Sequence, residues 1–111
     1  MKTDSEILLE LTPEAYAPSD DTYLMISAVN LMPGQRVLEI GTGSGIIALH
    51  CAKAGAEVTA SDISLGSLDC AKHNAQLNDL DIHLIQSDMF SNIEGKFDII
   101  IFNPPYLSGQ D

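Results

Sequence analysis

Three alternating glycines, Gly41, Gly43 and Gly45, follow a short β-branched run and precede a stretch of helical composition. Glycine has no Cβ, so the backbone can turn sharply there and approach a ligand closely. The dinucleotide pattern G-x-G-x-x-G would need glycine where this chain has Ile46, which weakens a pyrophosphate interpretation. Glu39 precedes the loop, and its carboxylate would repel a pyrophosphate. The spacing therefore predicts a nucleotide-type ligand with a cationic group near Glu39.

Two acidic residues follow later strands at positions that suit the rest of such a ligand. Asp62 lies about 20 residues beyond the loop, where a carboxylate accepts hydrogen bonds from ribose hydroxyls in nucleotide-binding α/β folds. Ile63 can then lie on an adenine face. Asp88 can receive the adenine amino group, with Met89 as its apolar neighbour. Each acidic residue, taken singly, could equally cap the helix or turn that follows it.

The segment Asn103-Pro104-Pro105-Tyr106 could orient a planar amino group. Two consecutive prolines fix φ twice and remove two backbone donors, so the chain is rigid and rich in acceptors there. The Asn103 side-chain oxygen and the Pro104 carbonyl could accept the two hydrogens of an NH2 group, and Tyr106 could stack on its plane. A simple strand terminator and turn is the alternative. The glycine loop upstream favours the chemical interpretation.

Strands that alternate with helices must position these residues. The alternation indicates right-handed crossovers and an α/β fold, a doubly wound and mostly parallel sheet with helices on both faces. The fourth strand is nearly all apolar, which suits cover on both of its faces. A helix from Ser19, ended by Pro33-Gly34, precedes the first strand. The sequence predicts strands at 36–40, 58–61, 82–85 and 98–102, and helices at 46–54 and from Ser64, the latter with Leu65, Leu68, Ala71 and Ala75 on its buried face.

Residues Glu39 to Gly45 resemble motif I of the class I S-adenosylmethionine-dependent methyltransferases, and Asp62 and Asp88 match the later acidic positions of that family. The resemblance covers nearly the whole chain. It implies a single Rossmann-like domain at 1–111, with an N-terminal segment at 1–33 and a core at 34–111. It also implies S-adenosylmethionine as the cofactor, with the glycine loop beneath its methionine part. The implied cofactor-binding residues are Thr22, Glu39, Gly41, Thr42, Gly43, Gly45, Asp62, Ile63, Asp88, Met89 and Asn103.

A second resemblance concerns the group that receives the methyl. The Asn-Pro-Pro-Tyr segment is similar to that of methyltransferases acting on amino groups of bases or on the glutamine amide. Tyr16 to Tyr23 resembles the Tyr-x-Pro-x-Glu-Asp-Thr segment of HemK-type protein glutamine methyltransferases. Those enzymes modify translation release factors, so the resemblance implies in-line attack by an amide nitrogen without a metal. The implied catalytic residues are Asn103, Pro104 and Tyr106, and the implied substrate-binding residues are Tyr16, Pro18, Asp21, Asn103, Pro105 and Tyr106.

Two alternatives stay open: an adenine or guanine amino-methyltransferase acting on nucleic acid, and a cofactor-binding module without turnover. A formal charge of −11 with only 5 Lys and Arg leaves little cationic surface for phosphate contacts, which favours a protein substrate. The family's sheet has further strands beyond the fourth, where this chain ends. We therefore expect a truncated sheet and a fragment, an oligomer or a dependent partner. Short archaeal and eukaryotic members are often helped by a small zinc-binding partner, which is an analogy here.

The cysteines, the histidines and the hydropathy indicate the compartment and which kinds of site to exclude, but they suggest no catalytic chemistry. Cys51 and Cys70 stand alone in helical segments, which predicts two buried thiols in a reducing compartment. His50, His73 and His83 show no metal-ligand spacing, so no metal site is expected. No apolar run approaches the ~20 residues of a membrane span, and no basic start precedes an apolar stretch. These features predict a cytoplasmic protein that makes no membrane contact.

Overall fold

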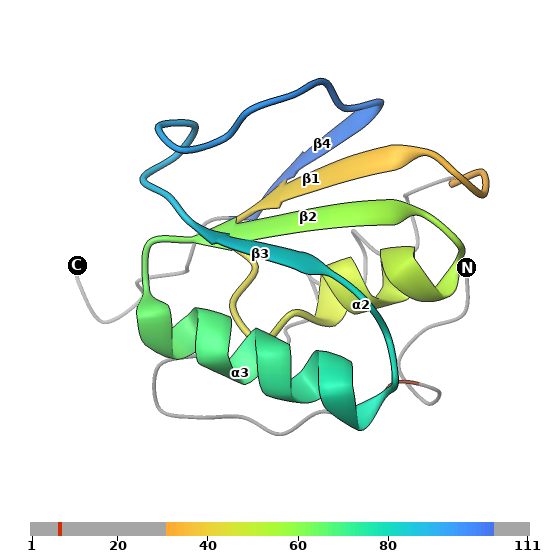
Figure 1. Ribbon diagram of the computed structural model, residues 1–111, viewed down its shortest axis with the longest axis horizontal. Helices are drawn as coiled ribbons and strands as arrows, with labels where there is room; N and C mark the ends of the chain where they lie inside the picture. The colour runs from red at the N-terminus through yellow and green to blue at the C-terminus, as the bar shows by residue number, and fades with distance from the viewer. Residues whose placement is uncertain (1–6, 8–30, 104–111) are drawn as a thin grey trace.

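The computed structural model describes Ile7 and residues 31–103, which contain a four-stranded parallel sheet in the order β3-β2-β1-β4 (Figure 1). The elements follow one another as β1 (Arg36–Ile40), α2 (Ile46–Lys53), β2 (Glu57–Asp62), α3 (Leu65–Leu77), β3 (His83–Gln86) and β4 (Ile99–Phe102). The predicted strands and helices of this region are confirmed, with small shifts at their ends. The helix predicted from Ser19 lies outside the described residues.

The two described helices lie on the same side of the sheet (Figure 1). From β1 to β2 to β3 the chain steps each time toward the same edge, so right-handed crossovers place α2 and α3 on one face. The chain then returns past β1 to form β4, through residues 87–98, which contain no helix. The sequence predicts helices on both faces of the sheet, but the described residues form helices on one face alone.

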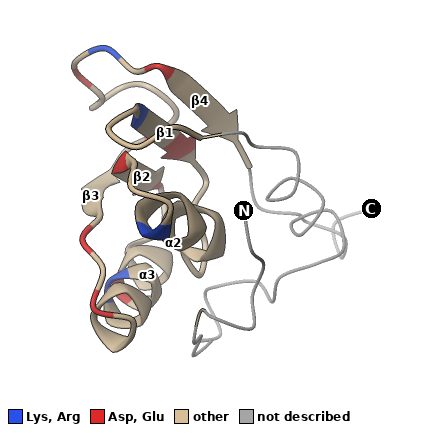
Figure 2. Cartoon of the chain, turned by 90° about the vertical axis from the view of Figure 1, so that its right-hand side faces the viewer, with Lys and Arg blue, Asp and Glu red and all other residues tan. Residues whose placement is uncertain are grey.

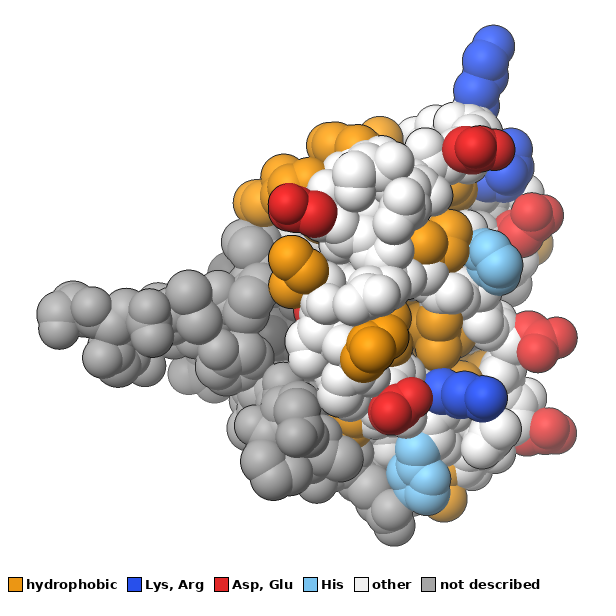
Figure 3. Space-filling view, turned by 60° about the vertical axis from the view of Figure 1, so that its left-hand side comes forward, with side chains coloured by type: hydrophobic (Ala, Val, Ile, Leu, Met, Phe, Trp, Pro, Cys, Tyr) orange, Lys and Arg blue, Asp and Glu red, His pale blue; other side chains and the backbone are white. Residues whose placement is uncertain are grey.

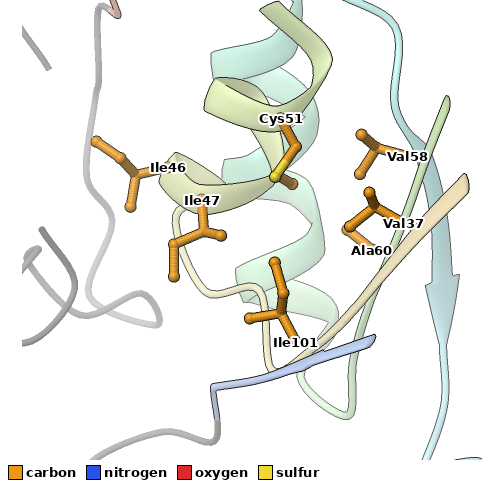
Figure 4. Close-up of a cluster of buried hydrophobic side chains, with 8 residues drawn as sticks. Val37, Ile46, Ile47, Cys51, Val58, Ala60 and Ile101 are labelled. Atoms are coloured by element: carbon orange, nitrogen blue, oxygen red, sulfur yellow. The ribbon is translucent and has the colours of Figure 1, made fainter. Parts of the chain in front are cut away.

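The core lies between α2 and the middle of the sheet (Figure 4). Val37 of β1 and Ile101 of β4 point toward the helix, where Ile47 and Cys51 meet them. Ile46 to Cys51 are all buried, so the start of α2 is enclosed rather than amphipathic. Cys51 and Cys70 are both buried thiols outside any disulfide, as predicted. Burial raises the pKa of the Cys51 thiol to about 12, and the charge of Glu39 adds to that rise.

Strand β4 is less covered than its apolar sequence suggests. The parallel register sets Ile100 beside Leu38 and Phe102 beside Ile40. Leu38 and Ile40 are buried, whereas Ile100 is 54% and Phe102 is 49% exposed. The prediction that this strand is covered on both faces is therefore wrong. The reason is that β4 lies at the edge of the sheet, beyond β1, and among the described helices only α2 packs near its inner face.

Helix α3 packs much as its spacing predicts, with one exception. Leu68, Ala71 and Ala75 are buried, and Ser64 caps the helix by accepting a hydrogen bond from the backbone N–H of Ser67 (3.1 Å). Leu65 is 61% exposed, so the prediction that it belongs to the buried face is wrong. It is the first residue of a helix that begins at the carboxyl end of the sheet, where little of the sheet is left to pack on (Figure 1).

Candidate functional site

Residues 41–45, the glycine loop, leave β1 and fold back over the end of β2. Gly41, Gly43 and Gly45 have φ values of 86°, 55° and 89°, in the left-handed region that favours glycine. The backbone N–H groups of Gly41 and Thr42 both donate to the carbonyl of Ser61, each over 2.9 Å. The predicted sharp turn is therefore built by three left-handed glycines and fastened to the neighbouring strand.

Helix α3 supports the glycine loop from the other side. A Cβ on Gly45 would lie 3.1 Å from the Cβ and 3.3 Å from the Cα of Ala71, so only glycine fits there without a shift. Asn74 is fully buried, and its side-chain amide donates to the carbonyl of Ser44 over 2.9 Å. Asn74 was not among the site residues predicted from the sequence. Its spacing from Ala71, three residues along the same helix, was the signal that it shares the buried face.

Asp62 ties the glycine loop to the start of α3. One carboxylate oxygen accepts from the backbone N–H of Gly43 and the other from that of Ser64, each over 3.0 Å. The residue is only 6% exposed. A carboxylate has roughly four acceptor positions, so two bonds leave capacity for further donors. The capping role and the ribose-binding role that the sequence left open for Asp62 are therefore compatible.

Glu39 lies inside the protein, between the glycine loop and β4. Its side chain is fully buried, one carboxylate oxygen accepts from the Thr42 hydroxyl (2.8 Å), and the other accepts from the Asn103 side-chain amide (3.4 Å). Burial raises the pKa of Glu39 to about 7 from an ordinary value of 4.5, and the nearby Asp62 adds to the rise. Hydrogen bonds from Thr42, Asn103 and the Ala48 backbone act in the opposite direction.

Residues 87–93, the β3 turn, form the third part of this end of the sheet. The Ser87 hydroxyl donates to the Met89 carbonyl (2.9 Å) and accepts from the Asn92 backbone N–H (3.0 Å), so the turn is held by its own residues. Met89 has a φ of 57° and is 46% exposed. Asp88 is exposed as well, which leaves these two of the three predicted adenine contacts open to solvent.

Ile63, the other predicted adenine contact, lies at the same end of the sheet. Its side chain is 60% exposed, and its backbone carbonyl accepts from the Gln86 side chain over 3.0 Å. That bond links the ends of β2 and β3. Seen from this end, the surface carries exposed hydrophobic side chains with acidic ones among them (Figure 3). The composition suits an apolar ring flanked by hydroxyl and amino groups.

The charges near the site are acidic. Among the described residues, Lys and Arg occur at 36, 53, 72 and 96. Arg36 starts β1 at the amino end of the sheet, where its guanidinium lies 3.6 Å from Glu57 and 5.3 Å from the ring centre of Phe97. The others lie on α2, α3 and the loop before β4 (Figure 2). Within the described region, none of these basic residues lies in the glycine loop or in the β3 turn.

Within residues 31–103 the structure brings five of the predicted site residues into two neighbouring hydrogen-bonded groups: Glu39 with Thr42 and Asn103, and Asp62 with Gly43. In the same part of the chain, no three His, Cys, Asp or Glu residues are grouped as metal ligands would be, and no helix is long and apolar enough to cross a membrane. Seven predicted site residues lie outside the described residues: Tyr16, Pro18, Asp21, Thr22, Pro104, Pro105 and Tyr106.

Comparisons with known proteins agree with this geometry. A family model described as "Methyltransferase small domain" matches residues 18–111. A protein of Methanocaldococcus jannaschii, whose name provisionally assigns it to the protein glutamine methyltransferases, is 45% identical over 102 residues, covering 91% of this chain and 52% of that protein. A release factor glutamine methyltransferase of Streptococcus pneumoniae is 43% identical over 113 residues, covering 100% of this chain and 39% of that protein. The chain thus spans about half or less of the length of these curated relatives.

Solved structures share the fold. The ribosomal protein L11 methylase of Lactobacillus delbrueckii has a TM-score of 0.71 at 37% identity, covering 83% of this chain and 50% of that chain. A 16S rRNA methyltransferase of Thermus thermophilus, in complex with AdoMet and guanosine, has a TM-score of 0.64 at 34% identity. The match covers 70% of this chain and 22% of that chain. The described sheet is thus the common part of much longer proteins.

Proposed function

The chain belongs to the methyltransferase small domain family, and on that premise we propose that the carboxyl end of its sheet binds S-adenosylmethionine and aligns it with a protein side-chain amide. One observation carries the proposal. The backbone N–H of Asn103 donates to the Ile40 carbonyl over 2.8 Å, so the segment expected to hold the amide begins beside the strand that enters the glycine loop. Cofactor loop and acceptor segment are thus neighbours, as transfer between two bound groups requires.

The described residues fit this cofactor. A Cβ on Gly43 would meet nothing within 4 Å, so the loop offers open space above its middle glycine, where a ligand can approach the backbone. Asp62 has acceptor capacity left for ribose hydroxyls, and Asp88 has exposed oxygens for the adenine amino group. Ile63 and Met89 expose apolar surface for the adenine ring. The Thermus thermophilus relative, in complex with AdoMet, supports the same choice.

When bound, S-adenosylmethionine supplies a methyl group already activated by its sulfonium. The protein's part is alignment and electrostatics. The Asn103 side-chain oxygen and the Pro104 carbonyl accept the two hydrogens of the amide NH2, and Tyr106 stacks on the amide plane. Two acceptors draw the hydrogens aside, point the nitrogen at the methyl group and increase its electron density. As the new N–C bond would form, the C–S bond would break and its electron pair would stay on the sulfur of the departing thioether, and the proton lost from the nitrogen would pass to water.

The proposed substrate is a glutamine side chain of a translation release factor, the substrate class named for the Streptococcus pneumoniae relative. The absence of Lys and Arg from the glycine loop and the β3 turn argues against phosphate contacts and supports a protein over a nucleic acid. Because the chain spans only part of those relatives, turnover, the substrate and any partner are all part of the proposal. An oligomer or a small zinc-binding partner, expected from the sequence, remains a prediction.

Two measurements test the proposal in order. Calorimetry of the 111-residue chain should detect binding of S-adenosylmethionine and none of NAD, and binding of NAD alone would overturn it. Transfer of labelled methyl to a peptide containing Gly-Gly-Gln should exceed transfer to a matched Gly-Gly-Asn peptide, whose amide is one methylene shorter. Equal labelling of the two peptides, or labelling only of an adenine-containing oligonucleotide, would reject the protein amide as substrate.

A further inference from the structure

The side chains of Glu39 and Asn103 connect the two halves of the proposed site inside the protein. The amide nitrogen of Asn103 lies 3.4 Å from a carboxylate oxygen of Glu39, although 64 residues separate them in sequence. The other oxygen of Glu39 accepts from the Thr42 hydroxyl in the glycine loop. The backbone of Asn103 is held as well, through its N–H and the Ile40 carbonyl. Asn103 is therefore fastened at both its main chain and its side chain.

The chemistry of the two groups determines which way the amide is turned. In the structure the NH2 of Asn103 faces Glu39 and donates to it, and an ionised carboxylate, which only accepts hydrogen bonds, favours this orientation. The amide is planar, with nitrogen and oxygen on opposite arms, so its oxygen is turned away from Glu39. Only this orientation offers a carbonyl oxygen to the NH2 group of the substrate. If the Asn103 amide were flipped, its own NH2 would face the substrate NH2, and two donors would meet.

We propose that Glu39 is a positioning residue, which holds the Asn103 amide with its oxygen presented to the substrate nitrogen. The inference rests on the proposed function and adds a residue to it. The sequence predicts that Glu39 binds the cofactor, but its side chain is fully buried, and its two oxygens accept hydrogen bonds from Thr42 and Asn103.

The surroundings of Glu39 argue that its carboxylate is more than packing. Its strand neighbours Leu38 and Ile40 are buried and apolar, and Ile101 lies beside it in the register of β4. An apolar side chain would fill such a position without the cost of burying a charge. A buried acceptor is called for there by the donors that it binds, the side chains of Thr42 and Asn103 and the backbone of Ala48.

Nuclear magnetic resonance of the chain without ligand tests the contact directly. The chain is labelled with 15N-asparagine, and the side-chain NH2 signal of Asn103 is assigned as the one that disappears in Asn103→Ala. It should shift with pH around 7, because the pKa of Glu39 is raised to about 7. The shift should vanish in Glu39→Gln. Asp62, the ionisable group that acts on Glu39, and Cys51, on which Glu39 acts, are both kept in that variant. An Asn103 signal that does not titrate, or titrates equally in Glu39→Gln, overturns the inference.

Turnover separates positioning from a purely structural role. Glu39→Gln keeps an acceptor oxygen, whereas Glu39→Met has similar length and none, so kcat should be at least about tenfold lower in Glu39→Met. The calorimetric Kd for S-adenosylmethionine should be equal in the two variants. Ser61→Ala is the matched control, because its hydroxyl bonds the backbone carbonyl of Glu39 and not the carboxylate (3.2 Å). It should keep the wild-type kcat. Equal kcat in the Gln and Met variants would contradict the inference. If the chain binds no cofactor, the proposed function fails, and the resonance experiment still tests the role of Glu39.

Discussion

The glycine loop and the β3 turn lie at the same end of one sheet, yet they are held in opposite ways. The glycine loop is fastened from outside itself, by Asp62 at the end of β2 and by Asn74 of α3, and its side chains Thr42 and Ser44 are buried. The β3 turn is closed mainly by its own hydrogen bonds, among them those of Ser87, and its middle residues are exposed.

The difference corresponds to two ways of contacting one ligand, by the backbone of the glycine loop and by the side chains of the β3 turn. The part that must approach a ligand by its backbone is built in advance and supported by two neighbouring elements, which reduces the ordering cost of binding. The part that meets a ligand by side chains has less support and can adjust locally. We therefore expect substitutions in and beneath the glycine loop to change stability, and those in the β3 turn to change mainly binding.

The largest effect should come from the charge buried beneath the glycine loop. Because the pKa of Glu39 is raised from 4.5 to about 7, the folded chain binds a proton between these values that the unfolded chain has released. Its contribution to stability is thus present below pH 4.5 and is lost as the pH rises through 7. The loss amounts to about 3 kcal/mol in the free energy of unfolding. Urea unfolding between pH 4 and 8 measures it.

Glu39→Gln is the control for that pH dependence. Glutamine does not ionise, so the difference in unfolding free energy between wild type and variant should change across the pH range by the amount attributed to Glu39. All other groups titrate in both proteins and cancel. Parallel pH profiles for the two proteins would mean that the carboxylate is not buried as the structure has it.

A second effect comes from contact between the glycine loop and α3. Gly45 and Gly34 have nearly the same φ, 89° and 86°, but a Cβ on Gly45 would press on Ala71, whereas one on Gly34 would meet nothing within 4 Å. Both alanine variants bear the backbone strain, and only Gly45→Ala bears the contact. Gly45→Ala should lose about 1–3 kcal/mol more stability than Gly34→Ala in urea unfolding. Equal losses would show that α3 does not brace the loop.

Much of this arrangement could be predicted from the sequence, because its signals are local. Apolar runs mark the strands, Ser64 marks the start of α3, and the spacing of the glycines marks the loop and the methyltransferase family, which the family model confirms. The support of the loop by Asn74 could not be predicted, since it spans 30 residues and depends on how α3 is docked. The exposure of Ile100 could not be predicted either, because it depends on which elements pack against an edge strand.

The orientation of the Glu39 side chain could be predicted only in part from the sequence. Alternation along β1 sets Val37 and Glu39 on one face and Leu38 and Ile40 on the other. Which face meets a helix could not be decided, because both carry apolar residues. The structure has Val37 in the core cluster with α2, so Glu39 is turned inward and not toward solvent.

A third effect concerns binding at the middle of the glycine loop. Gly43 has a φ of 55°, which alanine can adopt at a cost of about 1 kcal/mol, and an added Cβ would meet no protein atom within 4 Å. Gly43→Ala should therefore fold nearly as well as wild type. If S-adenosylmethionine occupies the open space, its affinity should fall at least about tenfold by calorimetry. Unchanged affinity would place the ligand elsewhere.

The smallest effect is expected at the residue of the β3 turn that shares this backbone conformation. Met89 has a φ of 57°, and its side chain is 46% exposed. In Met89→Gly the relief of left-handed strain is offset by the greater freedom of glycine in the unfolded chain, so the free energy of unfolding should change by less than about 1 kcal/mol. Affinity for S-adenosylmethionine should fall modestly, by loss of apolar contact with the adenine ring. A loss of stability as large as that of Gly45→Ala would mean that the β3 turn is as firmly built as the glycine loop, and the contrast between them would not hold.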